Sequence, residues 1–107
     1  MNDTEKTIAK KLVELAIEQG YTVSVFDGEE YPVKRSRDVE VIVNALGSTD
    51  HDTLTIRKPE QLAKDVPIGS ILLIWGNHRD LISDYTDNAA TNAIVARCMM
   101  EFEQGAA

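Results

Sequence analysis

The chain has 107 residues, of which 43% are hydrophobic and 27% charged, proportions typical of a soluble globular protein rather than of a disordered or fibrous one. Eleven Lys and Arg against eighteen Asp and Glu give a net charge of −7. This excess of carboxylates disfavours direct nucleic-acid binding, which depends on cations that displace counterions from phosphates.

The length suits one domain with its own hydrophobic core, and we predict a single α+β domain over residues 1–107. The only cysteine, Cys98, has no partner for an internal disulfide, which favours a reducing compartment. The chain begins without a basic and then apolar leader, and its longest apolar run is far shorter than the ~20 residues that span a bilayer. We therefore predict a cytoplasmic protein without membrane association.

Apolar residues at helical spacing predict a first helix that ends near Gln19, with Asp3 or Thr4 as its cap and Gly20 as its stop. Strict alternation over residues 21–26 then predicts a strand with one core face.

Residues 29–35 are predicted to run back in an extended or irregular conformation, in which Pro32 restricts regular secondary structure. Ser36 caps a second helix over residues 37–46, and Gly47 ends it. The apolar stripe of this helix consists of Val39, Ile42, Val43 and Leu46.

Residues 53–57 alternate again, which predicts a second strand with Leu54 and Ile56 facing inward. The following segment, residues 58–65, makes a short helical turn with Pro59 at its first position.

Residues 71–75 are the longest apolar run in the chain, between Gly69 and Gly76. Such a run, bounded by glycines, predicts a central strand buried on both faces. A loop over residues 76–80 then lets residues 81–85 return antiparallel, although Leu81, Ile82 and Tyr85 also fit helical spacing.

Asp87 or Asn88 caps a final helix over residues 89–104. The fold class is therefore α+β, with a three- or four-stranded, mainly antiparallel sheet packed with three helices. The placement of the first strand, parallel or antiparallel, stays open.

The polar segment after the central strand is the first candidate for a binding site, because it gathers charged and aromatic side chains at one edge of the sheet. The candidate residues are Trp75, Asn77, His78, Arg79, Asp80, Asp84 and Tyr85. The structural alternative, which we favour, is an ion pair between Arg79 and Asp80 and a solvated charge at Asp84. Trp75 either closes the core or anchors an interface, and core is the preferred interpretation.

His51 lies between two aspartates, Asp50 and Asp52, and could be held charged or ligate a metal. Neighbours along a strand point to opposite sides, so we favour a simple turn before a strand. Cys98 falls in the apolar stripe of the last helix, which predicts packing rather than nucleophilic chemistry.

The chain contains no GxGxxG, GxxxxGK[ST], HExxH or GxSxG motif. Dinucleotide binding, P-loop hydrolysis and the common hydrolase mechanisms therefore lack sequence support, and we predict no cofactor, no resident metal and no catalytic residue.

The segments Leu73-Ile-Trp-Gly-Asn77 and Ile82-Ser-Asp-Tyr-Thr-Asp-Asn88 resemble a pattern in small uncharacterised proteins of tailed bacteriophages and prophages. Residues 21–28 and 48–50 are similar to the rest of that pattern, so the resemblance spans roughly residues 20–88. It implies a phage or prophage origin and no known activity, and it assigns no catalytic residue.

Three hypotheses on function follow. The leading one is a small acidic, non-enzymatic module that binds a host or phage protein, since acidic surfaces are steered to basic partners. The alternative is a small metal-binding domain or enzyme that uses residues 78–87. The third is self-association into a homodimer through Trp75 or the last helix.

Overall fold

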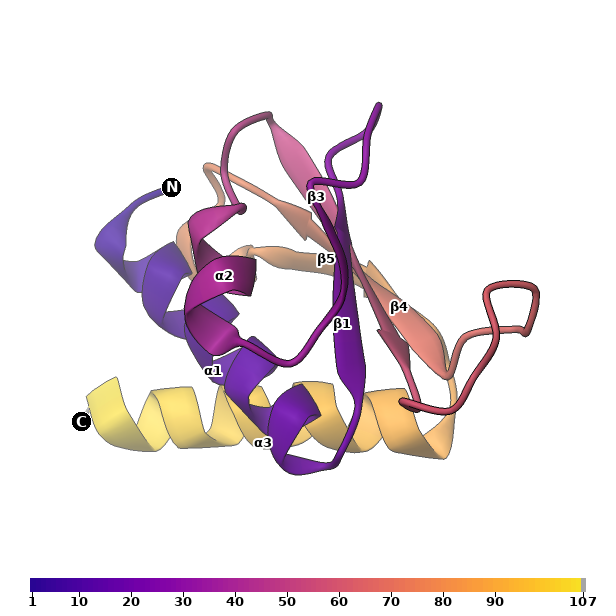
Figure 1. The fold of residues 1–107 in the computed structure, drawn as a ribbon. Helices are drawn as coiled ribbons and strands as arrows, with labels where there is room; N and C mark the ends of the chain where they lie inside the picture. Colours follow the sequence, from indigo (N-terminus) through magenta and orange to yellow (C-terminus); the bar gives the residue numbers. More distant parts are fainter. Residues whose placement is uncertain (107) are drawn as a thin grey trace.

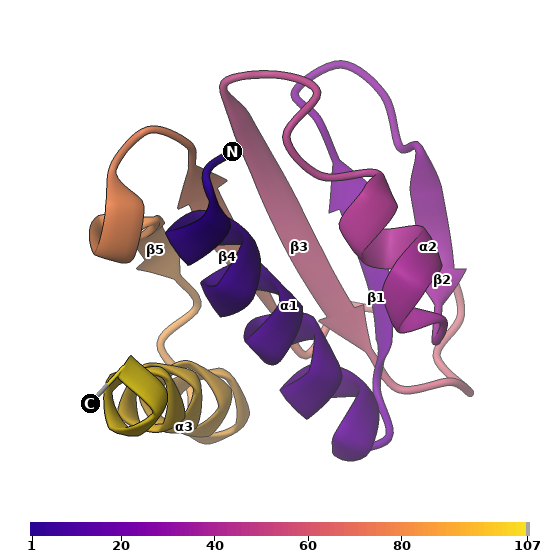
Figure 2. The ribbon, with the colours of Figure 1, turned by 90° about the vertical axis from the view of Figure 1, so that its left-hand side faces the viewer.

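Five strands form one antiparallel sheet, the first two helices lie over one of its faces, and the third helix packs beside the first (Figure 1 and Figure 2). The computed structural model describes residues 1–106. The strands are ordered β2-β1-β3-β4-β5, and every neighbouring pair is antiparallel. The predicted α+β class, the three helices and the antiparallel sheet are therefore confirmed. The elements in chain order are α1 (Asp3–Glu18), β1 (Thr22–Phe26), β2 (Val33–Ser36), α2 (Val39–Asn44), β3 (His51–Arg57), β4 (Gly69–Ile74), the 3-10 turn η1 (His78–Asp80), β5 (Ile82–Tyr85) and α3 (Ala89–Ala106).

The predicted number of strands, three or four, is wrong because the return after β1 pairs as β2. Val25 lies opposite Val33 and Val23 lies opposite Ser36, so two residues of β2 face one residue of β1 in between. This bulge interrupts the alternation by which a strand is recognised, and four residues are too few to restore it.

Several predicted boundaries are also wrong. Helix α1 is capped by Asn2 rather than by Asp3 or Thr4. Helix α2 covers only Val39–Asn44. Its N-terminal cap is Asp38 rather than the predicted Ser36, because the Asp38 carboxylate accepts from the backbone N–H groups of Glu40 and Val41. Residues 58–65, predicted as one short helical turn, form two separate hydrogen-bonded turns, at residues 58–61 and 62–65.

The hydrophobic core lies between the sheet and the helices. In β4, Ile71 and Leu73 face the helices and are at most 1% exposed, whereas Leu72 and Ile74 on the other side are only partly buried. Burial of this strand on both faces, as predicted, is therefore wrong, because α1 and α2 cover only one face and α3 packs beside α1 on that side (Figure 2). Antiparallel sheets commonly leave one face to water in this way.

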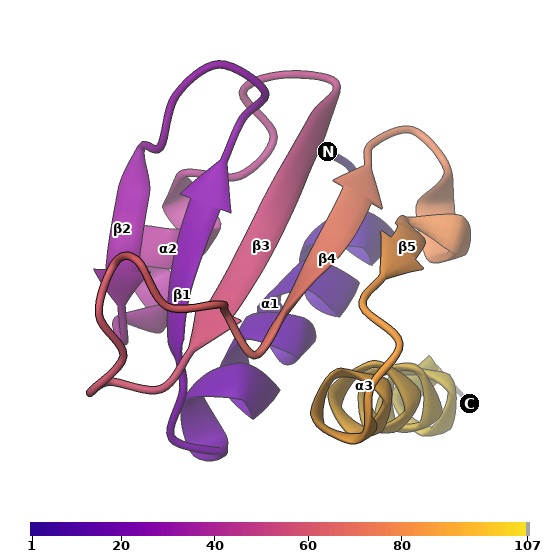
Figure 3. The ribbon, with the colours of Figure 1, turned by 90° about the vertical axis from the view of Figure 1, so that its right-hand side faces the viewer.

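The sheet face away from the helices, here called the open face, is rich in hydroxyl groups. The loop of residues 58–68 crosses this face in front of β1 and β2 (Figure 3). By strand alternation the open face carries Thr22, Ser24, Phe26, Thr53, Thr55, Arg57, Ser70, Leu72 and Ile74.

A buried carboxylate fastens the first helix to the end of β4. Glu5 is 1% exposed, and its Oε1 atom accepts from the backbone N–H of Asn2 at 3.0 Å, which completes a capping box. Its Oε2 atom accepts from the backbone N–H groups of Gly76 at 2.6 Å and Asn77 at 3.1 Å. Burial raises the pKa of Glu5, but these three hydrogen bonds outweigh it and the pKa is lowered from its ordinary value.

Substitution of Gly69 by Ala is expected to destabilise the fold by about 1–3 kcal/mol. A Cβ atom at Gly69 would lie 2.1 Å from Oγ1 of the buried Thr91 and 3.3 Å from Cβ of Thr86. Urea unfolding of Gly69→Ala measures this loss, and Gly105→Ala, where a Cβ meets nothing within 4 Å, is the matched control. Recovery of most of the stability in the double variant Gly69→Ala, Thr91→Ala would identify the hydroxyl contact as the cause, and an unchanged loss would contradict it.

Substitution of Glu5 by Gln is expected to destabilise the protein by about 2–3 kcal/mol at neutral pH, since an amide cannot accept from all three N–H groups. Because the folded-state pKa of Glu5 is lowered, its stabilisation is present above the ordinary pKa of 4.5 and is lost as the pH falls through the folded value. The difference between wild type and Glu5→Gln should therefore shrink in urea unfolding between pH 7 and pH 3.

The exposed Glu14 on the same helix provides the control. Glu14→Gln should leave the stability unchanged across this pH range. A difference between wild type and Glu5→Gln that does not vary with pH would refute the role of the charge.

Candidate functional site

The predicted site residues on the turn after β4 are occupied by internal contacts. The backbone N–H of Asn77 binds Glu5, and its side-chain amide donates to the carbonyl of Ile74 at 3.3 Å. The ring of His78, a residue with the unusual positive φ of 53°, lies 2.8 Å from the side-chain nitrogen of Asn2. These contacts support the position of the turn rather than a ligand.

Arg79 pairs with an acidic residue of the last helix. Its Nη2 atom lies 2.7 Å from Oε1 of Glu103, and both side chains are more than half exposed. The predicted loop ion pair with Asp80 is therefore wrong, because η1 faces the C-terminal half of α3 and places Glu103 closer. An exposed pair of this kind contributes little stability.

Trp75 belongs to a polar cluster around Asp52, on the side of the sheet that faces the helices. Its indole N–H donates to Oδ2 of Asp52 at 2.8 Å, and the backbone N–H of Gly47 donates to the same oxygen at 2.9 Å. Asp52 is 0% exposed, and its Oδ1 atom has no hydrogen-bond partner among the described residues. Burial raises the pKa of Asp52, and the two hydrogen bonds only partly oppose this.

The remaining candidates lie on β5, at the opposite end of that strand from η1. Asp84 and Tyr85 line a shallow groove on the open face with a volume of about 300 Å³. Asp84 accepts from the backbone N–H of Tyr85 at 2.9 Å, and the Tyr85 ring is 41% exposed. The seven predicted site residues therefore lie in three separate places: the turn after β4, the polar cluster around Asp52, and this groove. The groove is called the β4–β5 groove below. It is lined by Thr53, Ser70, Leu72, Asp84, Tyr85 and Thr86.

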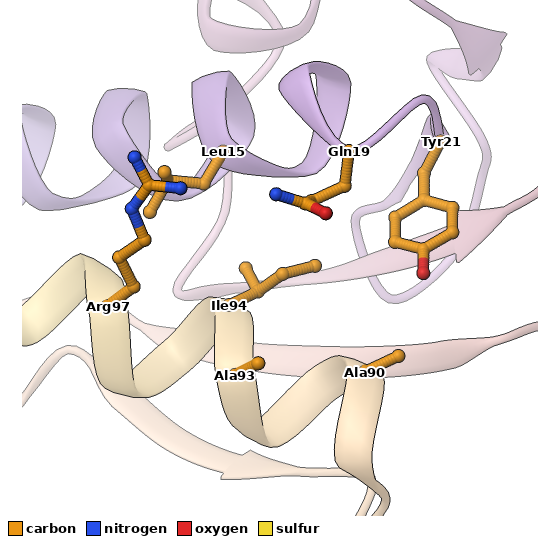
Figure 4. Close-up of a pocket in the computed structure, with 7 residues that line it drawn as sticks. All are labelled: Leu15, Gln19, Tyr21, Ala90, Ala93, Ile94 and Arg97. Carbon is orange, nitrogen blue, oxygen red and sulfur yellow. The ribbon is translucent and has the colours of Figure 1, made fainter.

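A second cleft, of about 280 Å³, lies between α1 and α3 (Figure 4). Leu15 and Gln19 face it from α1, and Ile94 and Arg97 face it from α3 (Figure 4). The guanidinium of Arg97 is neutralised by Glu101 at 2.5 Å and Glu18 at 3.6 Å. The hydrogen bond to Glu101, with the charges of both carboxylates, raises the pKa of Arg97. The cleft therefore has an apolar floor, and its described lining residues offer a ligand no free cation.

A third groove, of about 330 Å³, lies between the open face and the loop of residues 58–68. It is here called the basic groove, because three of its seven lining residues are cations. The lining residues are Ser24, Tyr31, Lys34, Arg35, Thr55, Arg57 and Ala63.

The described residues give no support to a metal centre or a nucleophilic cysteine. No group of three or more His, Cys, Asp or Glu in residues 1–106 could hold a metal ion. His51 is exposed while Asp52 points into the core, so the flanking carboxylates do not converge on it. Cys98 is fully buried, as predicted, and burial raises the pKa of its thiol to about 12. No helix within residues 1–106 has the length and apolar character needed to cross a membrane.

Both buried carboxylates of the described residues, Glu5 and Asp52, could have been recognised from the sequence. Asn2 and Glu5 have capping-box spacing, and Glu5 continues the apolar stripe of α1. Asp52 is in phase with Leu54 and Ile56, so extending the strand back by two residues places it inward. The basic groove had no such signal, because it depends on the bulge in β2 and on the course of a long loop.

Asp52→Asn is expected to flatten the pH dependence of stability. The folded-state pKa of Asp52 is raised, so its carboxyl contributes most below the ordinary pKa of 3.8, and this contribution is lost as the pH rises through the folded value. The stability of Asp52→Asn should therefore increase relative to wild type from pH 4 to pH 7. Fluorescence of Trp75, the single tryptophan, follows the urea unfolding.

The exposed neighbour Asp50 serves as the control, and Asp50→Asn should run parallel to wild type over the same pH range. Parallel profiles for wild type and Asp52→Asn would show that the buried carboxyl does not titrate differently in the folded state.

Comparison with known proteins gives no relative to which these grooves could be matched. No protein-family model matches the chain, and neither a curated protein nor a solved structure shows significant similarity to it.

Proposed function

We propose that this protein is a non-enzymatic protein-binding module, and that the β4–β5 groove and the surface around it contact the partner. The observation that carries the proposal is the open face itself, since no helix within residues 1–106 covers it and it contains the groove of about 300 Å³. An uncovered sheet face with a shallow groove suits an extended protein segment better than an enclosed small molecule.

The side chains around the groove are of the kind found at protein interfaces. Tyr85 lines the groove and is 41% exposed, and Leu72 and Ile74 on the open face are only partly buried. Tyrosine presents a large apolar ring with a polar tip, and it is enriched at interfaces for this reason. Hydroxyl groups of Thr53 and Ser70 between these apolar groups supply hydrogen bonds.

The charge of the protein indicates the chemistry of the partner. Asp84 is the only carboxylate among the residues that line the groove, and the whole chain carries a net charge of −7. A segment with an apolar side chain for the Tyr85 ring and a Lys or Arg for Asp84 would be complementary. The overall charge would steer such a basic partner to the protein.

The dispersal of the titratable candidates supports binding over catalysis. Arg79 is paired with Glu103, and the His78 ring contacts Asn2. Asp84 lies on a different part of the structure, so these groups do not form the close constellation that general acid–base or nucleophilic catalysis requires.

Affinity capture from a lysate of the natural host, with charge variants as baits, tests the proposal. A genuine partner should be retained by wild type and be depleted about tenfold with Asp84→Lys, since like charges across an interface are strongly unfavourable. Glu14→Lys makes the same change of charge on the exposed side of α1 and should retain the partner.

Quantitative mass spectrometry of the captured proteins provides the readout. The absence of any protein with this pattern, under conditions in which a known binding module recovers its own partner, would refute the proposal. Tyr85→Ala should give the same depletion as Asp84→Lys without a change of charge.

A further inference from the structure

We propose that the basic groove is a binding site for a small phosphate monoester carried on a planar ring, such as a nucleoside monophosphate. The groove occupies the β1–β2 end of the open face, beneath the loop of residues 58–68 (Figure 3). It is distinct from the β4–β5 groove, and the two have no lining residue in common. The inference is therefore independent of the proposed protein partner.

The bulge in β2 brings two consecutive cations to the same groove. Consecutive residues of a regular strand point to opposite faces, yet Lys34 and Arg35 both line it. They lie together opposite Ser24, whose hydroxyl oxygen accepts from the backbone N–H of Arg35 at 2.9 Å. Bulges that redirect side chains in this manner are common beside binding sites.

Arg35 adopts a backbone conformation that usually belongs to glycine. Its φ of 49° lies in the left-handed region, which is unfavourable for a residue with a Cβ atom. Strained residues of this kind cluster at functional sites, where the side chain is needed in spite of the backbone. At this position glycine would suit the backbone, and arginine supplies a guanidinium to the groove.

The two guanidinium groups are oriented without being neutralised. Arg35 donates through Nη1 to the backbone carbonyl of Gln61, and Arg57 donates through Nη1 to the backbone carbonyl of Asp65 at 2.8 Å. A guanidinium has five N–H donors, so each group keeps most of its donors for a ligand. The arrangement contrasts with Arg97, which is held by two carboxylates.

The charge of the groove is uncompensated within the described residues. Within residues 1–106, the ion pairs closer than 4.0 Å have Lys11, Arg79 and Arg97 as their cations. None of these pairs involves a cation of the groove. No carboxylate is among the described residues that line the groove, although carboxylates outnumber cations in the chain by eighteen to eleven. The local charge is therefore opposite to that of the whole protein, and it favours an anion.

The other lining groups define the kind of anion. Ser24, Thr55 and Tyr31 add hydroxyl groups, and arginine forks match the oxygens of a phosphate. The Tyr31 ring packs against Phe26 with centroids 4.8 Å apart, and Tyr31 remains 51% exposed. A planar ring of a ligand could therefore stack on a tyrosine whose position is already held by Phe26. A volume of about 330 Å³ is at the small end of ligand pockets, and the net charge of −7 would repel a polyanion.

Titration with AMP in a phosphate-free, low-salt buffer, followed by the amide signals in NMR spectra, tests the site. AMP should shift the signals of Ser24, Arg35 and Thr55, and ribose 5-phosphate should shift the same signals more weakly because it has no aromatic ring. Adenosine, which lacks the phosphate, should leave them unchanged.

Variants of the groove separate binding from folding. Arg57→Gln and Arg35→Gly should each weaken AMP binding about tenfold or more, since each removes a charge-assisted contact. Arg35→Gly should at the same time keep or raise the melting temperature, because glycine accepts the left-handed conformation. Arg37→Gln removes the same charge two residues away, outside the groove, and should change the affinity less than twofold.

Several results would overturn the proposal. Binding of adenosine as strong as that of AMP would show that no phosphate is recognised. Equal AMP affinity in wild type, Arg57→Gln and Arg35→Gly would place any binding elsewhere. Shifts of the groove signals by a hexaglutamate peptide but not by AMP would indicate an acidic protein segment as the occupant instead.

Discussion

The buried carboxylate of Glu5 is the contact on which the relation between the helix layer and the sheet depends. A carboxylate removed from water is strongly unfavourable unless hydrogen bonds replace its hydration, and here three backbone N–H groups do so. One of them belongs to the cap of α1, and the other two belong to the turn after β4. Because that turn leads through η1 into β5, the start of the chain and the far edge of the sheet are positioned by one side chain.

The one-sided layer of helices accounts for where function can lie. The face toward the helices is mainly apolar, with the buried Asp52 as its polar exception, whereas the open face is a mixture of hydroxyls, a few apolar side chains and cations. The two arrangements of arginine in the structure illustrate the difference. Arg97 on the helix side is neutralised by two acidic neighbours. Arg35 and Arg57 on the open face donate instead to carbonyl oxygens, which orient the guanidinium groups without neutralising their charge.

The sequence predicted what depends on local periodicity. The α+β class, the helices and the antiparallel strand at Ile82–Tyr85 follow from the spacing of apolar residues and from glycines at the ends of the elements. The missing strand, β2, has a bulge that removes its alternation, and the helix caps at Asn2 and Asp38 depend on hydrogen bonds that several neighbouring polar residues could have made. The sequence could not predict that helices cover β4 on one face only. An uninterrupted apolar run has the same residue pattern whether its second face is buried or partly exposed.

The candidate site was harder to predict, because it depends on contacts between distant segments. The predicted residues were chosen for their proximity in the chain, yet Arg79 and Asp84 serve different parts of the fold. The basic groove joins β1, β2, β3 and a loop, and Lys34 and Arg35 meet there at a bulge in which Arg35 has a φ of 49°. No pattern of residue types encodes such an angle when the residue is arginine.

The loop of residues 58–68 is joined to the sheet through the same guanidinium groups that line the basic groove. Its carbonyls at Gln61 and Asp65 accept from Arg35 and Arg57, so the order of the loop and the direction of those side chains are thermodynamically linked. Any anion that favours the present side-chain directions must, by reciprocity, also favour the present course of the loop. Residues 58–68 would then act as a reporter of occupancy, and sequence changes far along the loop would alter affinity without touching the ligand.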